Sequence, residues 1–305
     1  MPVLWQLPPF VSYHRIVDED IFSVFEYKMP SFSKGQKRIA SLICESYDKA
    51  AFMTASCLGK QAGVSESTVV RFAMELGYEG YPQMQKAMQE MVLNRLTSVQ
   101  RMGVTTDRIG TQDVVSTVLH ADAEKLRQTG ETVDRTVFLK AVQNILNANN
   151  IYILGVRSAS ALASFFGYYL QYMFDRVHII TSGSAGEVLE QLINVKAGDT
   201  VIAFSFPRYS SSTVEGVAYC RSMGATVIGI TNSMVSPLAE YCDCVLVAKS
   251  DMVSIVDSLV APLSLVNALI VALAAGREDV LRANFDKLET IWQTHHIYEK
   301  KDEYL

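Results

Sequence analysis

Apolar residues in the first hundred positions recur at spacings of three and four, which is the period of amphipathic helices. The pattern predicts helices that begin after Ser33, Thr54 and Ser65, because each hydroxyl can accept a hydrogen bond from a first-turn N–H group. Gly63 ends the second helix, and a loop at 79–82 precedes a fourth. The short turn between the second and third helices predicts a helix-turn-helix, with the early side chains of the third helix outside.

The rest of the chain alternates short β-branched runs with amphipathic segments, which predicts parallel strands buried by crossover helices. The predicted strands are Ile151–Leu154, Val177–Ile180, Thr200–Phe204, Thr226–Ile230 and Cys244–Val247. A helix from about Thr111 to Thr129 precedes them, and helices at Leu259–Ala275 and Glu278–His296 follow. The expected fold class is therefore α + α/β, an all-α helix-turn-helix domain followed by a doubly wound parallel α/β domain of five strands.

A length of 305 residues suits two domains, since single cores rarely grow this large. Residues 1–30 hold four prolines and show no period, so we expect an irregular arm there. We place the helix-turn-helix domain at 31–97, a polar, glycine-containing linker at 98–112, and the α/β domain with its C-terminal helix at 113–305.

The composition is 49% hydrophobic and 19% charged, which excludes a disordered chain. The start of the chain does not resemble a signal peptide, and the apolar run Ser258–Ala275 is interrupted by Pro262 and Asn267. We therefore expect a cytoplasmic protein with no membrane partner. Five scattered cysteines, including the pair Cys242 and Cys244, resemble neither a disulfide framework nor a metal site, and we expect no metal and no cofactor.

The net charge of −5 argues against a nucleic-acid binder only until the charge is divided along the chain. From Ser31 to Met102, nine basic and six acidic residues give +3, which leaves −8 on the remainder. A basic module on an acidic body is typical of a protein that contacts phosphate at one end only.

The candidate DNA contacts lie on the second and third helices of the predicted helix-turn-helix. Ser65, Ser67 and Thr68 stand at the start of the third helix, where hydroxyls can meet phosphates or base edges. Arg71 lies one turn further on and can reach either, and Lys60 adds a positive charge on the second helix. The hydroxyls alone have an equally good structural explanation, because any small helical bundle carries such caps.

The complete pattern around these residues resembles the N-terminal domain of the RpiR family of bacterial transcription regulators. That pattern is A-x-x-A-G-V-S-x-x-T-V-x-R-F-x-x-x-L-G-Y/F-x-G-Y/F, and the chain follows it closely through Tyr81, although Cys57 to Gly59 replaces a more usual leucine-alanine pair. The resemblance covers roughly Ser31 to Ala275. It implies that the α/β domain is a sugar-isomerase-like (SIS) domain that binds phosphosugars, in agreement with the strand pattern.

The loop after the first strand offers an anion site. Gly155 permits a tight turn, and Ser158 and Ser160 place hydroxyls near N–H groups at the start of a helix, with Arg157 between them. A capped strand-to-helix turn without a ligand is the alternative. The SIS resemblance, which implies a ligand contact in this loop, favours the site.

The loop after the third strand departs from the family. SIS domains carry S-x-S-G-x-T here, and an alignment on Ser205 puts Ser210 at the family threonine. Pro207 replaces the second serine, and Arg208 replaces the glycine and adds a fixed positive charge. The loop still suits an anion, either a carboxylate or a differently seated phosphate. Tyr209 is either a lid over the ligand or a surface aromatic.

Glu187 follows the second strand at the same edge of the sheet, where it can bind a sugar hydroxyl or simply favour the start of a helix. It is also the one obvious base for a competing function, that of a sugar-phosphate isomerase. A third alternative is a DNA-binding protein whose SIS domain only oligomerises.

The resemblance implies a non-enzymatic regulator of carbohydrate metabolism genes that senses a phosphosugar or a related anionic sugar metabolite. Paired SIS domains would set two recognition helices roughly 34 Å apart on a palindromic double-stranded operator, in a homodimer or homotetramer. The hydrophobic residues Tyr168, Tyr169, Leu170, Tyr172 and Phe174 are predicted to belong either to that interface or to the core.

Overall fold

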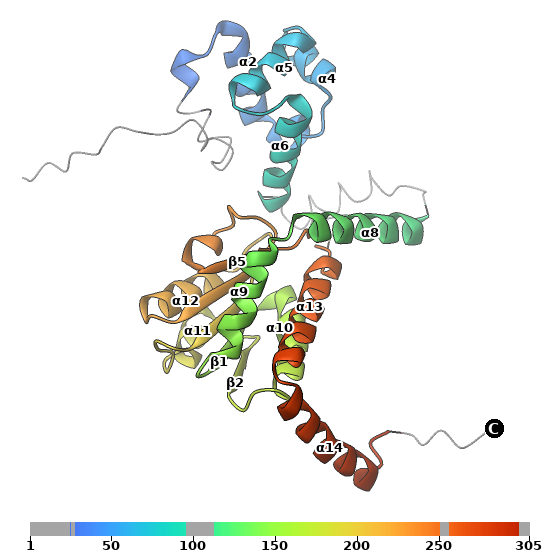
Figure 1. Ribbon diagram of the computed structural model, residues 1–305. Helices are drawn as coiled ribbons and strands as arrows, with labels where there is room; N and C mark the ends of the chain where they lie inside the picture. The colour runs from blue at the N-terminus through green and yellow to red at the C-terminus, as the bar shows by residue number, and fades with distance from the viewer. Residues whose placement is uncertain (1–24, 26–27, 96–112, 251–255, 299–305) are drawn as a thin grey trace, which may run out of the picture. The chain divides into compact units, whose positions relative to one another are not determined.

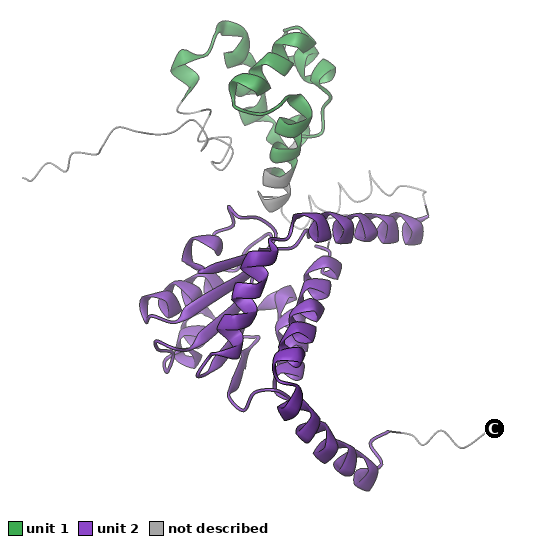
Figure 2. Cartoon of the chain, in the orientation of Figure 1, with its two compact units in different colours: residues 1–103 green, residues 104–305 purple. Residues whose placement is uncertain are grey.

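A computed structural model of the chain describes residue 25 and residues 28–95, 113–250 and 256–298. It divides into two compact units, Met1–Gly103 and Val104–Leu305 (Figure 2). Each unit is described by itself. Most of the predicted arm, the predicted linker and the expected helix start at Thr111 lie outside the described residues.

The described part of unit 1 is helical. Its elements are η2 (Met29–Ser31), α2 (Lys34–Glu45), α3 (Tyr47–Ala50), α4 (Ala55–Ala62), α5 (Glu66–Glu75) and α6 (Tyr81–Arg95). The predicted caps are confirmed: Ser33 forms a capping box with Gln36, and the Thr54 hydroxyl accepts from the N–H of Cys57 at 3.2 Å. The chain therefore enters both helices where the sequence indicates.

Unit 1 differs from the prediction at α6, which begins at Tyr81 although the sequence favoured a loop through Pro82. Proline is tolerated in the first turn because its missing N–H would have no partner inside the helix. The Tyr81 hydroxyl donates to the Met53 carbonyl at 2.7 Å, and burial raises the pKa of Tyr81 to about 12. This contact ties the start of α6 to the segment before α4.

Unit 2 holds a five-stranded, wholly parallel sheet in the order β2-β1-β3-β4-β5. Its strands are β1 (Ile151–Leu154), β2 (Val177–Ile180), β3 (Thr200–Phe204), β4 (Thr226–Thr231) and β5 (Cys244–Val247), and its other elements are α8 (Val114–Thr132), α9 (Arg135–Leu146), η3 (Arg157–Ala159), α10 (Ser160–Leu170), α11 (Ala185–Gln191), α12 (Ser211–Ser222), η4 (Ala239–Tyr241), α13 (Val260–Gly276) and α14 (Glu278–His295). The predicted strands and fold class are confirmed, with β4 one residue longer. The sequence pattern did not predict α9.

Helices cover both faces of the sheet, as Figure 1 shows: α9, α10 and α13 on one face, α11 and α12 on the other. Alternate strand residues divide between them, so Ile151 and Ile153 pack against the first group while Tyr152 and Leu154 pack against the second. Because both faces are buried, the ligand-accessible parts of the sheet are the loops at the strand ends.

The hydrophobic residues predicted as core or interface at 168–174 differ in their burial. Leu170 is fully buried in the first core, whereas Tyr168 is exposed. Tyr172 packs against Phe285 of α14, with ring centroids 5.7 Å apart. No single helix of the described residues is long and apolar enough to span a bilayer, although the bent pair α13 and α14 reaches that length and composition together.

Polar contacts hold α8 against the rest of unit 2. Lys125 is only 5% exposed and lies 3.3 Å from the Asp122 carboxylate, which also accepts a hydrogen bond from the Ser258 hydroxyl at 2.6 Å. The Thr129 hydroxyl accepts from the N–H of Lys249, just beyond β5, at 3.0 Å. These bonds attach α8 to the start of α13 and to the end of β5.

Removing the carboxylate with Asp122→Ala should destabilise unit 2, because it leaves the buried Lys125 ammonium unpaired. Such a loss costs about 3–5 kcal/mol in a fully buried pair. Since the Asp122 side chain is 18% exposed, we expect about 2 kcal/mol, or a fall of roughly 4–8 °C in melting temperature for a unit of this size. Differential scanning fluorimetry of the full chain measures it.

The matched control is Glu124→Ala on the exposed side of α8, where Glu124 pairs with Arg127. Because that pair is fully solvated and screened, its loss should leave the melting temperature nearly unchanged. The double variant Asp122→Leu/Lys125→Met should recover most of the lost stability, since it removes both charges together. Equal melting temperatures for Asp122→Ala and Glu124→Ala would contradict the role of the pair.

Candidate DNA-binding helix and effector site

The turn between α4 and α5 depends on two glycines. Gly63 adopts a left-handed conformation, φ 66°, which favours glycine, and it ends α4. At Gly59 an added Cβ would lie 3.0 Å from the Val64 carbonyl oxygen, so a side chain there would press on the turn. The departure from the family pattern at Gly59 therefore lets α4 approach the turn closely.

The start of α5 gathers the predicted hydroxyls into one cluster. The Ser65 hydroxyl accepts from the Thr68 N–H at 3.3 Å and lies 2.9 Å from the Ser67 hydroxyl and 2.8 Å from the Thr68 hydroxyl. Ser65 and Ser67 are exposed, and Thr68 is half-buried. Capping therefore uses part of the hydrogen-bonding capacity of Ser65, whereas the Ser67 side chain stays accessible.

Positive charge surrounds the same turn. Arg71 is exposed one helical turn beyond Ser67, and its Nε donates to the Ser67 carbonyl at 3.3 Å. Lys60 is exposed at the end of α4. Sequence reasoning missed Arg38 of α2, whose guanidinium lies against the turn: a Cβ at Gly63 would be 3.0 Å from its Nη1. Only tertiary packing brings Arg38 there, so no local sequence signal marked it.

The strand order places the predicted effector loops together. Chain winding reverses between β1 and β3, and ligands of open parallel sheets bind beyond the carboxyl ends of the strands at such a reversal. Leu154 pairs with Ala203, so the loops that begin at Gly155 and Ser205 leave neighbouring strands at one level. We call this end of the sheet the carboxyl edge.

The loop after β1 is tightly packed. A Cβ at Gly155 would lie 2.8 Å from the Ala159 carbonyl oxygen, so the glycine is needed for close approach. Arg157 is exposed and has a positive φ of 59°. Ser158 is exposed, but the Ser160 hydroxyl donates to the Arg157 carbonyl at 2.6 Å. The Ser160 hydroxyl therefore makes a bond within the loop, and its role in an anion site stays a prediction.

The loop after β3 contains one buried hydroxyl and one exposed cation. Ser205 is 3% exposed, and its hydroxyl has no hydrogen-bond partner, whereas Arg208 is exposed with φ 60°. The Tyr209 hydroxyl donates to Oδ1 of Asn232 at 2.8 Å. Ser210 is the N-cap residue of α12, but its side chain makes no capping hydrogen bond. Its hydroxyl lies 2.8 Å from the Ser212 hydroxyl.

Glu187 lies in the first turn of α11, where it forms a capping box with Ser184. Its Oε2 accepts from the Ser184 N–H at 2.6 Å. Hydrogen bonds from the Ser184 backbone and side chain hold the pKa of the Glu187 carboxyl below its usual value. The carboxylate is thus exposed, ionised and used as a helix cap.

Further polar groups at the carboxyl edge were missed from the sequence. In the described part of the chain, the buried side-chain polar atoms without a partner are the hydroxyls of Ser205, Thr213, Thr231, Ser236 and Ser250. All five follow a strand on its carboxyl side or end it. Asn232 follows β4 as Ser205 follows β3, and that shared position is the signal that could have indicated it.

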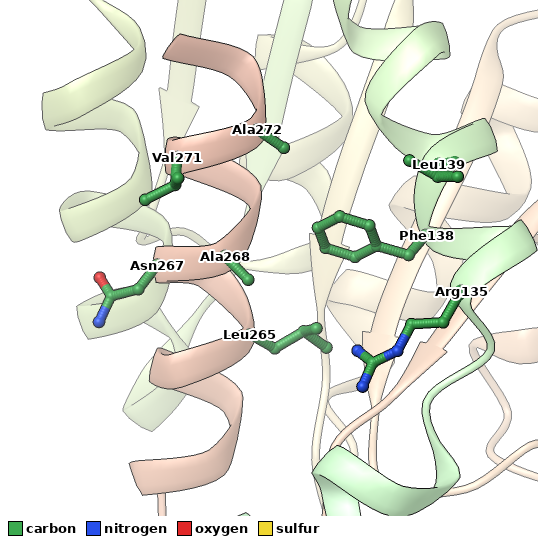
Figure 3. Close-up of a pocket in the computed structure, with 8 residues that line it drawn as sticks. All are labelled: Arg135, Phe138, Leu139, Leu265, Asn267, Ala268, Val271 and Ala272. Atoms are coloured by element: carbon green, nitrogen blue, oxygen red, sulfur yellow. The ribbon is translucent and has the colours of Figure 1, made fainter. Parts of the chain in front are cut away.

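A cavity of about 600 Å³ lies elsewhere, between α9 and α13 (Figure 3). Phe138 projects from α9 toward α13, and Leu265 lies on the facing side. Its lining is mostly apolar, with Arg135 and Asn267 as the polar members, and contains none of the predicted effector residues.

The thiols and histidines do not assemble a metal centre in the described ranges, where no three His, Cys, Asp or Glu side chains come together. Burial raises the pKa of Cys242 to about 12, and its Sγ donates to the Leu238 carbonyl at 3.1 Å. Cys242 is thus a protonated packing residue.

Two family models match the chain. The helix-turn-helix domain of the rpiR family matches residues 23–94, and the SIS domain matches residues 144–272. An uncharacterised HTH-type transcriptional regulator of Caldanaerobacter subterraneus is 23% identical over 86% of this chain and 94% of its own length. The HTH-type transcriptional regulator HexR of Pseudomonas aeruginosa is 23% identical over 73% and 76%.

Solved structures agree with this division. The sugar isomerase domain of an RpiR transcription factor from Sphaerobacter thermophilus is 28% identical, with a TM-score of 0.56 over 59% of this chain and 99% of that one. The Vibrio vulnificus NanR protein, complexed with ManNAc-6P, shares the fold at 20% identity, with a TM-score of 0.57 over 90% of this chain and 99% of that one. With its rpiR-type helix-turn-helix and SIS domain, the chain belongs to the RpiR family of DNA-binding transcription regulators.

Proposed function

We propose that α5 is the recognition helix of this regulator and that Arg71 reads a base edge of its operator. The observation that carries the proposal is the exposed polar face of α5, where Ser67 and Arg71 stand one turn apart beside the hydroxyl cluster. Such an N-terminal face enters the major groove in helix-turn-helix proteins. Lys60 and Arg38 flank it and supply phosphate contacts, which position the helix without reading sequence.

Arg71→Ala should weaken operator binding about 5- to 150-fold and relax specificity at one position, since a base contact from arginine contributes about 1–3 kcal/mol. Lys60→Ala should weaken binding to all sequences alike and reduce the salt dependence by about one phosphate contact. A gel shift measures both, with an operator selected by the full chain from random DNA.

Arg127→Ala is the matched control, because Arg127 is also exposed but pairs with glutamates on α8. It should leave operator affinity unchanged. If Arg71→Ala binds as tightly as the parent, Arg71 makes no contact with the operator.

The same proposal includes a homodimer, which binds a palindromic operator with two recognition helices roughly 34 Å apart. The surface that supports it is the apolar groove between α9 and α13. Leu139 and Val271 line this groove and are 61% and 69% exposed, which is unusual for residues on helices that also form the core. A second copy of the chain can cover both helices with the same residues.

Val271→Glu should therefore convert the dimer into a monomer, because burial of a carboxylate in a mostly apolar interface carries a large desolvation cost. Light scattering after size-exclusion chromatography measures the mass. Val235→Glu is the control, since Val235 is 53% exposed on the loop after β4. A parent chain with the mass of one copy, or a Val271→Glu variant that still dimerises, would contradict this surface.

We further propose that the carboxyl edge binds a sugar phosphate that regulates operator binding, as part of the control of carbohydrate metabolism genes. The switch point between β1 and β3 supports the site, and the partnerless Ser205 hydroxyl offers it a hydrogen bond. The similar NanR chain was solved with ManNAc-6P. Gly155 keeps the first loop close to the sheet, and Ser158, Ser210 and the loop amides complete the cradle.

The carboxyl edge binds this ligand without catalysing its isomerisation. An isomerase needs a base with a pKa near the working pH, and Glu187 has the opposite character because its capping bonds lower the pKa. Its carboxylate already accepts the Ser184 N–H as part of the capping box. A sugar phosphate that is released unchanged is the expected result of incubation.

Ser205→Ala tests the effector site cleanly, because the hydroxyl makes no bond in the free protein and its loss should leave stability nearly unchanged. Calorimetry should show at least about tenfold weaker sugar-phosphate binding, the effect of a hydrogen bond to a charged group. The control is Ser236→Ala, another buried hydroxyl without a partner, which lies further along the loop after β4. Equal affinities for both variants would remove Ser205 from the site.

A further inference from the structure

The first turn of α2 lies against the start of α5. A Cβ added at Gly35 would lie 3.4 Å from Cγ1 of Val64 and 3.8 Å from Cγ2 of Thr68. About one turn further along α2, the Arg38 guanidinium lies against Gly63, in the turn between α4 and α5. One side of α2 therefore faces both this turn and the N-terminal end of the proposed recognition helix.

Hydrogen bonds and buried side chains fix α2 in this position. The Gln36 side chain accepts from the Ser33 N–H at 2.7 Å within the capping box, and its Nε2 donates to Oε2 of Glu75 at the end of α5. Ile39 and Ile43 of α2 are fully buried. The exposed residues at the start of α2 therefore stand on a helix whose place beside α5 is set by the fold.

These exposed residues are basic. Lys37 and Arg38 lie three and four residues beyond Lys34, so the three exposed cations are neighbours on the surface of the helix. Such charges weaken the start of a helix, because they repel one another and face the positive end of the helix dipole. No carboxylate among the described residues forms an ion pair with them. The fold therefore gains no electrostatic stabilisation from these cations, whereas an external anion would bind them favourably.

We propose that Lys34 and Lys37 bind phosphates of the operator backbone beside the groove that α5 enters, so that the DNA-binding surface includes α2 as well as the helix-turn-helix. The inference rests on the proposed role of α5 as the recognition helix. A lysine ammonium binds phosphate as a point charge and reads no sequence, so these contacts position α5. The net charge of +3 from Ser31 to Met102 has the sign that this role requires.

The double variant Lys34→Gln/Lys37→Gln removes both charges and keeps good helix formers. Fluorescence anisotropy of the full chain measures binding to the selected operator and to an unrelated duplex of equal length, over a range of salt concentrations. The slope of log affinity against log salt should fall by about 1.8 for each bound chain, since one phosphate contact contributes about 0.9. In about 0.1 M salt both duplexes should bind at least about tenfold more weakly, and by the same factor.

The melting temperature of this double variant should stay level or rise, because the repulsion at the start of α2 is relieved. Lys49→Gln is the matched control. Lys49 is also exposed, but it lies in α3, which follows the opposite end of α2, a helix roughly 18 Å long. This control should change neither the salt slope nor the affinity.

Two results separate the contact on α2 from the role of α5. An unchanged slope in the double variant, with operator binding still weakened in Arg71→Ala, would overturn the α2 contact and leave the recognition helix standing. Unchanged operator binding in both variants would overturn both. Weaker binding with a lower melting temperature in the double variant would assign the lysines to the stability of the fold and would also overturn the contact.

Discussion

The parallel pairing of β1 with β3 is the contact on which the rest of unit 2 depends. Parallel neighbours need crossover helices, and the right-handed crossovers that leave β1 and β3 in opposite directions place α10 and α12 on opposite faces of the sheet. The loops that follow the two strands therefore turn away from each other and leave a crevice between them. The residues proposed to hold the effector lie on the loops after β1 and β3.

The sequence predicts the sheet well because buried parallel strands consist of short β-branched runs, a pattern with few alternatives in a chain of this length. It predicts the first helices because cap residues mark their ends. It does not predict α3, a single turn without an apolar period, nor the start of α6 at Tyr81. There the tertiary bond from the Tyr81 hydroxyl to the Met53 carbonyl stabilises a helix start that local propensity alone would place later.

The candidate site is less predictable, because its properties arise from contacts between distant segments. The sequence places Arg157 and Arg208 in the loops after β1 and β3, but the sign of φ follows from how each loop packs. It also marks Glu187 without revealing that Ser184 holds its carboxylate. On α8, the Asp122 carboxylate that pairs with Lys125 also accepts a hydrogen bond from Ser258, 136 residues away along the chain, and no local pattern indicates such a contact.

The two units therefore provide different kinds of evidence about function. At the DNA-binding end, Ser65 stabilises the fold by capping α5, so its presence has a structural explanation whether or not it meets DNA. At the effector end, the left-handed arginines cost free energy, and the buried Ser205 hydroxyl gains no hydrogen bond within the chain. A buried hydroxyl that gains no bond within the chain is the stronger indication of a ligand, because a polar group of a bound molecule would satisfy it.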